Sequence, residues 1–165
     1  MAKPNQEPVK AKEIQLVIFR LREEEFGVEI NSVVEISRML DITRLPEAPG
    51  FIEGVVNLRG QVIPVVDLAK QFHLPPQAER PKTARVVVIE VGGETLGLLV
   101  DDVPEVLRVP ENEIEAPPEL VQGDAKSDYV KGVAKFGERL VVVLDLNRLL
   151  SPREVEAAGK TGKGG

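Results

Sequence analysis

The order of hydrophobic and polar positions in the first half of the chain returns in the second half. The corresponding segments, at shifts of 70 and then 78 residues, are 17–21 with 87–91, 26–28 with 96–98, 33–36 with 103–106, 51–55 with 129–133, and 65–68 with 143–146. Few residues are identical, but the apolar positions, glycines and acids keep their order. Such a repeat predicts two similar small folds packed against each other.

Short apolar runs separated by turn residues dominate both copies and predict β-strands. Each copy contains two expected hairpins. In chain order, the expected strands are 15–21, 26–30, 54–58, 61–66, 85–91, 95–100, 132–136 and 139–144. The Gly92-Gly93 turn is a good hairpin signal because glycine accepts positive φ.

Helix signals are few and short. Asn31 and Asp101 are suitable N-caps, so helix-like segments are expected directly after them, to Ile36 and Val106. Asp67 and Asp145 are also expected to act as N-caps. The short helices that they would begin are 67–73 and 145–150, and a capping box at 151–154 predicts a final helix to about residue 158.

Four or five short strands and little helix in each copy predict a small, strongly bent β-barrel. The fold class is therefore all-β, with two barrels related by the internal repeat. The expected boundaries are a tail at 1–13, a first barrel at 14–74, a Pro-rich linker at 75–81, a second barrel with the C-terminal helix at 82–158, and a tail at 159–165. A barrel of this size is marginal alone, so the two are expected to share an apolar seam.

Composition limits the function. Of the 165 residues, 42% are apolar, which supports a folded core, and five Phe, one Tyr and no Trp make that core aliphatic. The net charge of −6 disfavours nucleic-acid binding and direct docking to an anionic membrane. The absence of cysteine excludes disulfides and a thiol nucleophile. With no signal peptide and no apolar run of about 20 residues, a cytoplasmic location is expected.

No catalytic set is recognisable. The only histidine, His73, stands at the end of an expected short helix, where a cation is mildly favourable. The acidic pairs 101–102 and 124/128 are too sparse for a metal loop, and no phosphate-binding glycine loop is present. We therefore predict a protein without enzymatic activity, metal or cofactor.

The copies differ at the tip of the second hairpin. The first carries Asn57-Leu58-Arg59-Gly60 where the second carries Lys135-Phe136-Gly137-Glu138. Arg59 would stand on a tight turn, and its planar fork suits carboxylates and interface contacts. Two interpretations stay open: an exposed turn residue or an interaction residue.

These motifs resemble a known family. The Asn57–Gly60 tip, the following Val62–Leu68 run, and the segments 26–30, 33–36, 51–56 and 97–106 are similar to the bacterial chemotaxis coupling proteins of the CheW family, over about residues 14–150. The resemblance implies two SH3-like barrels with an apolar interface. It also implies a non-enzymatic adaptor between the cytoplasmic tips of methyl-accepting chemotaxis receptors and the regulatory domain of the histidine kinase CheA, recruited to the inner face of the membrane through receptor arrays.

The resemblance also implies which residues bind. Receptor-binding residues would be Ile30, Val33, Glu35, Asn57, Leu58 and Arg59. Kinase-binding residues would be Val106, Glu115 and Leu120. Two alternatives come from other classes: a small β-barrel RNA-binding protein, which the acidic balance and scarce aromatics oppose, and a hydrolase on a β-scaffold, for which no catalytic set is recognised.

Overall fold

A computed structural model describes residues 12–46, 52–116 and 129–149. The strands are β1 Glu13–Leu21, β2 Glu24–Glu29, β3 Val33–Arg38, β4 Ile52–Leu58, β5 Gln61–Asp67, β6 Arg85–Val91, β7 Glu94–Val100, β8 Asp102–Pro110, β9 Ile114–Glu115, β10 Val130–Phe136 and β11 Arg139–Leu144. The helical turns are η2 Ile30–Ser32, α1 Leu68–Gln71, η3 Glu111–Glu113 and α3 Leu146–Leu149. The all-β prediction and the four hairpins are confirmed.

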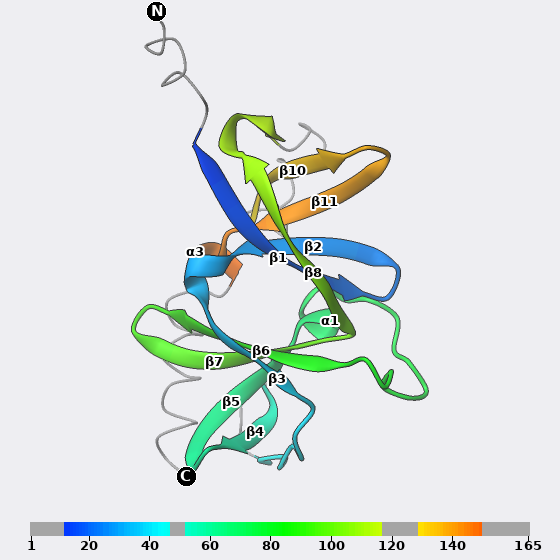
Figure 1. Cartoon of the computed structure of the whole chain (residues 1–165). Coiled ribbons are helices and arrows are strands. Elements are labelled where there is room, and N and C mark those ends of the chain that lie inside the picture. The colour runs from blue at the N-terminus through cyan, green and yellow to red at the C-terminus, as the bar shows by residue number, and fades with distance from the viewer. Residues whose placement is uncertain (1–11, 47–51, 117–128, 150–165) are drawn as a thin grey trace, which may run out of the picture.

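The strands form two curved sheets, which lie one above the other in Figure 1. The six-stranded sheet has the order β8-β1-β2-β11-β10-β9, and the five-stranded sheet has the order β3-β6-β7-β5-β4. In each sheet two hairpins are joined by one parallel pair, β2 with β11 and β5 with β7. The sheets therefore have the same plan, as the repeat predicted.

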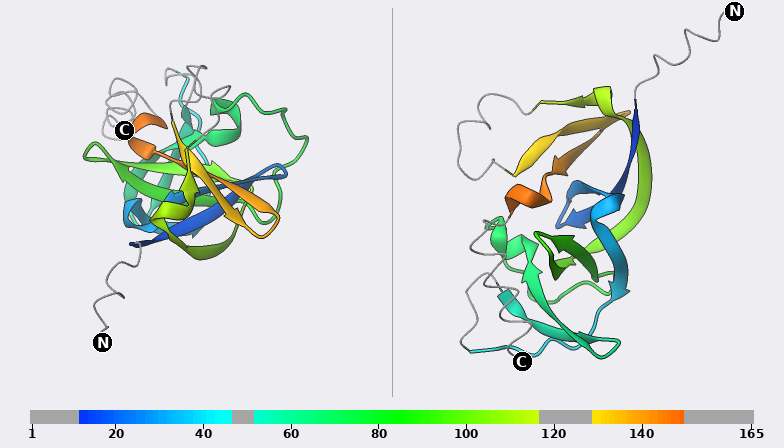
Figure 2. Two further views of the ribbon diagram at one scale, coloured as in Figure 1. Left: turned by 90° about the horizontal axis from the view of Figure 1, so that it is seen from above. Right: turned by 90° about the vertical axis from the view of Figure 1, so that its left-hand side faces the viewer.

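The sheets divide the chain differently from the expected barrels at 14–74 and 82–158. The first hairpin of each copy pairs with the second hairpin of the other copy, so each sheet contains strands from both halves. The chain changes sheet between β2 and β3 and again between β7 and β8, as can be followed in the right-hand view of Figure 2. Similar hairpins offer similar pairing edges within a copy and between copies, so the repeat alone could not reveal this exchange.

The two helix-like segments expected after Asn31 and Asp101 are strands. Only residues 30–32 form a helical turn, and β3 then pairs with β6, as β-branched residues favour. In β8, Pro104 falls at an irregularity of an edge strand, where a missing N–H is tolerated. Asp101 is not an N-cap, because its carboxylate accepts from the backbone N–H of Arg22.

The other predicted caps are confirmed. The Asp67 carboxylate accepts from the backbone N–H groups of Ala69 and Lys70, and that of Asp145 accepts from the N–H of Asn147. β1 already begins at Glu13, inside the expected N-terminal tail. The expected helix to residue 158 and the tail at 159–165 lie outside the described residues.

An apolar cluster between the sheets confirms the predicted seam. On β1, Val17 and Phe19 point into this central cluster, while Leu16 and Ile18 point into a separate cluster within their own sheet. The strand β6 alternates in the same way, because residues 87 and 89 are central while residues 86 and 88 belong to the core of the five-stranded sheet. Strands buried on both faces explain why these runs are apolar without polar alternation.

Two glycines mark equivalent crossings of the chain. A Cβ on Gly54 would lie 2.4 Å from the carbonyl oxygen of Thr43, and a Cβ on Gly132 would lie 2.6 Å from that of Glu115. Real side chains do not fit at such distances. The glycine shared by the aligned segments 51–55 and 129–133 is therefore required where a short edge segment crosses the hairpin.

Candidate interaction site

The β4–β5 hairpin ends in a tight two-residue turn. Arg59 has φ 54° and Gly60 has φ 85°, the positive values that a type I′ turn requires at both central positions. The Asn57 side chain fixes the turn, since its Oδ1 accepts from the N–H of Gly60 at 2.8 Å. Arginine rarely adopts positive φ. Asn or Gly would fit this backbone conformation better. The presence of arginine therefore indicates that its side chain makes a functional contact.

The Arg59 side chain reaches across to β3, which lies at the other end of the strand order of the five-stranded sheet from β4. Its Nη1 donates to Oε1 of Glu35 at 2.6 Å. The Arg59 side chain is 77% exposed, whereas that of Glu35 is 24% exposed. An exposed pair of this kind stabilises a fold little. Glu35 therefore fixes the orientation of the Arg59 guanidinium, while most of the Arg59 side chain remains accessible to a partner.

The structure brings together only some of the residues expected to bind receptors. Glu35, Asn57 and Arg59 meet at the hairpin tip. Leu58 packs against the core of the five-stranded sheet. Ile30 and Val33 are half-buried and pack against the central cluster, so only part of each side chain is accessible.

Sequence reasoning missed three exposed apolar side chains in this region. Val34 and Ile36 flank Glu35 along β3, and Val62 lies opposite Asn57 in the β4–β5 ladder. The signal was present in the alternation of 33–36, which the expectation of a helical segment concealed. Val34 and Ile36 lie on the face of β3 opposite to that of Glu35, since successive side chains of a strand point to opposite faces. Exposed apolar side chains such as these are typical of a docking surface.

The six-stranded sheet carries an equivalent arrangement. Nη2 of Arg139 donates to Oε2 of Glu105 at 2.7 Å, and Glu105 is the repeat equivalent of Glu35. Val106 and Leu140, the equivalents of Ile36 and Val62, are exposed. The arginine stands two positions later in the second copy. The hairpin tips therefore differ less in structure than their aligned sequences indicate.

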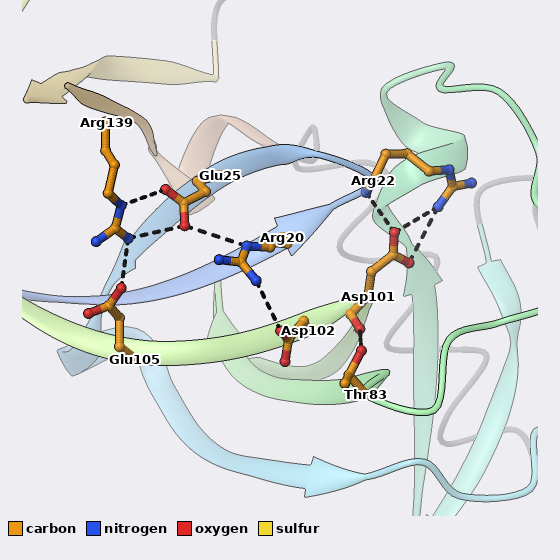
Figure 3. A network of polar contacts seen from close by, with 8 residues as sticks. All are labelled: Arg20, Arg22, Glu25, Thr83, Asp101, Asp102, Glu105 and Arg139. Carbon is orange, nitrogen blue, oxygen red and sulfur yellow. Dashed lines mark hydrogen bonds and ion pairs between the residues drawn. The ribbon is translucent and has the colours of Figure 1, made fainter.

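Arg139 also anchors a wider polar network, drawn in Figure 3. Its Nε and Nη2 donate to the two carboxylate oxygens of Glu25, both at 3.0 Å. Arg20 lies 3.6 Å from the same carboxylate and 3.4 Å from that of Asp102. The network joins the β1–β2 turn to β8 and β11 and fixes the rim of this barrel.

The network makes stability depend on pH. The pKa of the Glu25 carboxyl lies below its ordinary value of 4.5, chiefly because Arg139 donates hydrogen bonds to it, while burial acts in the opposite sense. The pKa of Arg139 is raised by Glu25 and then by Glu105. Because Glu25 is more acidic in the folded than in the unfolded chain, its contribution is present above pH 4.5 and is lost as the pH falls through the folded-state pKa.

We therefore expect Glu25→Gln to lower the free energy of unfolding at pH 7 and to lower it less at pH 3, because the contribution of Glu25 declines below pH 4.5. Urea unfolding of both proteins at several pH values measures this difference. Glu24→Gln, an exposed neighbour in the same strand, is the matched control and should leave the pH dependence unchanged. An equal loss at pH 7 and pH 3 for Glu25→Gln would contradict the prediction.

The structure does not bring together the two described residues that were expected to bind the kinase. Val106 is exposed on β8, at one end of the strand order of the six-stranded sheet. Glu115 lies on β9, at the other end of that order, and its Oε2 is 3.1 Å from Nζ of Lys135. Leu120 lies outside the described residues.

The described residues contain no group of three or more His, Cys, Asp or Glu side chains that could hold a metal ion. In the same part of the chain, no helix has the length and apolar character needed to cross a membrane.

A doubled β-barrel with charge-bridged hairpin tips and exposed apolar side chains beside them defines a protein-interaction module. Residues 15–154 match the CheW-like domain, and the chain belongs to this family. The family membership does not favour the RNA-binding alternative.

Similar proteins cover most of the chain. The "Chemotaxis protein CheW" of Treponema pallidum is 32% identical over 90% of this chain and 88% of its own. The "Probable chemotaxis protein CheW" of Rhizobium etli is 36% identical over 87% and 92%. The crystal structure of the scaffolding protein TtCheW from Thermoanaerobacter tengcongensis aligns with a TM-score of 0.76 at 36% identity, over 87% of this chain and 91% of its own. This likeness confirms the fold class of two SH3-like barrels.

Proposed function

We propose that this protein is a non-enzymatic scaffold that couples methyl-accepting chemotaxis receptors to the histidine kinase CheA. The observation that carries the proposal is the β4–β5 tip, where Arg59 is exposed and directed by Glu35. The names of the similar proteins, chemotaxis and scaffolding proteins, support the same function. The scaffold would lie in the cytoplasm, at the inner face of the membrane, through its contact with receptors.

The receptor contact would use the five-stranded sheet and its border with the other sheet. Receptor tips are helical hairpins, which fit an apolar groove with a polar rim. Ile30, Val33 and Leu58 would supply half-buried apolar surface. The rim of Glu35, Asn57 and Arg59 would fix the register of the bound helix.

The kinase contact would use the six-stranded sheet. Val106 offers exposed apolar surface on β8, and Glu115 offers a carboxylate that is exposed although Lys135 lies beside it. Leu120 belongs to the same proposed contact by its match to the family. Because the regulatory domain of the kinase is expected to have the same double-barrel fold, this contact would join one barrel to a similar one.

A reconstitution experiment tests the proposal. We expect the purified protein to bind the immobilised regulatory domain of the kinase and, separately, a soluble receptor fragment that contains the tip. When all three are mixed, we expect receptor-dependent stimulation of kinase autophosphorylation that disappears if the scaffold is omitted. The proposal fails if the folded protein binds neither partner, or if the kinase responds to receptors equally well without it.

A further inference from the structure

A polar cavity of about 660 Å³ lies away from the proposed receptor and kinase contacts. It is bounded by the start of β4, the helix α1 and the segment that leads to β6. Its lining includes Glu53, Arg44, Lys70, Arg80 and His73. The volume is in the usual range for small-molecule sites.

Three cations of this cavity converge on one carboxylate. Glu53 lies on β4, and its side chain is only 5% exposed. Its Oε1 accepts from Nζ of Lys70 at 2.6 Å, and its Oε2 accepts from Nη2 of Arg44 at 3.0 Å. Nη2 of Arg80 lies 3.7 Å from Oε2. We call these four residues the Glu53 cluster.

The Glu53 cluster contains more positive charge than a buried carboxylate needs. One acid faces three cations, so two positive charges have no acidic partner within the cluster. This excess is unusual in a chain whose net charge is −6. In the Arg139 network, by contrast, acidic groups outnumber arginines.

The other acids of the cavity do not neutralise this excess through direct contacts among the described residues. Asp101 accepts from the backbone N–H and the guanidinium of Arg22. Asp67 accepts from the first N–H groups of α1. Cations held a few ångströms apart repel one another, and a bound anion would relieve that repulsion.

The donors of the cluster remain accessible. The side chains of Arg44, Lys70 and Arg80 are 75%, 60% and 40% exposed, so each has N–H groups that Glu53 does not occupy. They come from three separate segments of the chain and meet at the Glu53 carboxylate. Glu53 takes up one donor of each cation, so the remaining N–H groups of three neighbouring cations suit a multiply charged anion such as a phosphate group.

We propose that this cavity binds a small dissolved molecule that carries a phosphate group. Glu53 positions the three cations by holding one donor of each near its own oxygens. The imidazole of His73 lines the same cavity and offers one further N–H group. The site is separate from Arg59, so its occupation does not require receptors or kinase.

Calorimetric titration with sodium pyrophosphate at low ionic strength tests the proposal, because salt screens such contacts. We expect saturable binding at one site per chain. Arg44→Gln and Lys70→Gln should each weaken binding about tenfold. Lys135→Gln, which removes the same charge from an exposed lysine on the other sheet, should stay within about twofold. Circular dichroism confirms that each variant is folded.

Several outcomes would overturn the assignment. Binding of pyrophosphate that does not saturate would show only general attraction to the surface. An equal loss in the Lys135→Gln variant would show that overall charge, not this cavity, sets the affinity. Citrate bound as tightly as pyrophosphate would exclude a preference for phosphate. Since the assay contains neither kinase nor receptor, its failure would leave the proposed scaffold function untouched.

Discussion

Replacing Phe19 by alanine is expected to lower the free energy of unfolding by about 3–5 kcal/mol. The Phe19 side chain is fully buried, and its ring stacks on that of Phe26 with centroids 5.8 Å apart. Both rings belong to the central cluster, to which both sheets contribute. A cavity there would therefore remove contacts from both barrels, and the loss would be a large share of the 5–15 kcal/mol that is typical of folded domains.

Urea unfolding followed by circular dichroism measures this effect. Because the two sheets share the central cluster, we expect a single transition at a lower urea concentration with an unchanged slope. Val62→Ala, at a side chain that is 41% exposed, is the control and should change the free energy by about 0.5 kcal/mol or less. A loss below about 1 kcal/mol for Phe19→Ala, or two separate transitions, would refute the idea of one common core.

Arg59→Ala is expected to leave the fold intact and to weaken receptor-dependent control of the kinase at least tenfold, or by about 1.4 kcal/mol in binding free energy. In the free protein Arg59 is exposed, so its pair with Glu35 adds little stability. When a partner covers the tip, the same pair would be removed from water, and truncating one member of a covered pair is strongly unfavourable.

Two further variants separate the possible roles of Arg59. Arg59→Lys keeps the charge but loses the planar fork, so it should recover only part of the coupling if the fork matters. Lys131→Ala removes another surface cation that pairs with a carboxylate, that of Glu29 at 2.9 Å, and should have no effect. Unchanged receptor and kinase binding for Arg59→Ala would show that Arg59 is merely a turn residue.

Local structure followed from the sequence where hydrophobic period and turn chemistry agreed. The hairpins, the tight turn at Gly60 and the caps at Asp67 and Asp145 are of this kind. The segment 33–36 was misassigned because a good N-cap residue precedes it. Its pairing with β6, which lies more than fifty residues away in the chain, decided the outcome over that local preference.

The candidate site could be predicted only in part. The family motif identified Arg59, and the structure joins it to Glu35 across 24 positions of sequence. The equivalent pair of Arg139 and Glu105 was missed because the arginine stands two places later on its hairpin. An ion pair depends on where side chains meet, and a position-by-position alignment of the two copies does not contain that information.

The exchange of hairpins between the two halves has a consequence for how the molecule can be made and divided. A ribosome must synthesise the chain to Val100 before the five-stranded sheet has all its members, and to Leu144 before the six-stranded one does. The β1–β2 hairpin is synthesised first, but β11, which pairs with β2, is synthesised last of all the strands. A gene cut at the Pro-rich linker would yield two fragments, each with some strands of both sheets and neither able to complete one by itself.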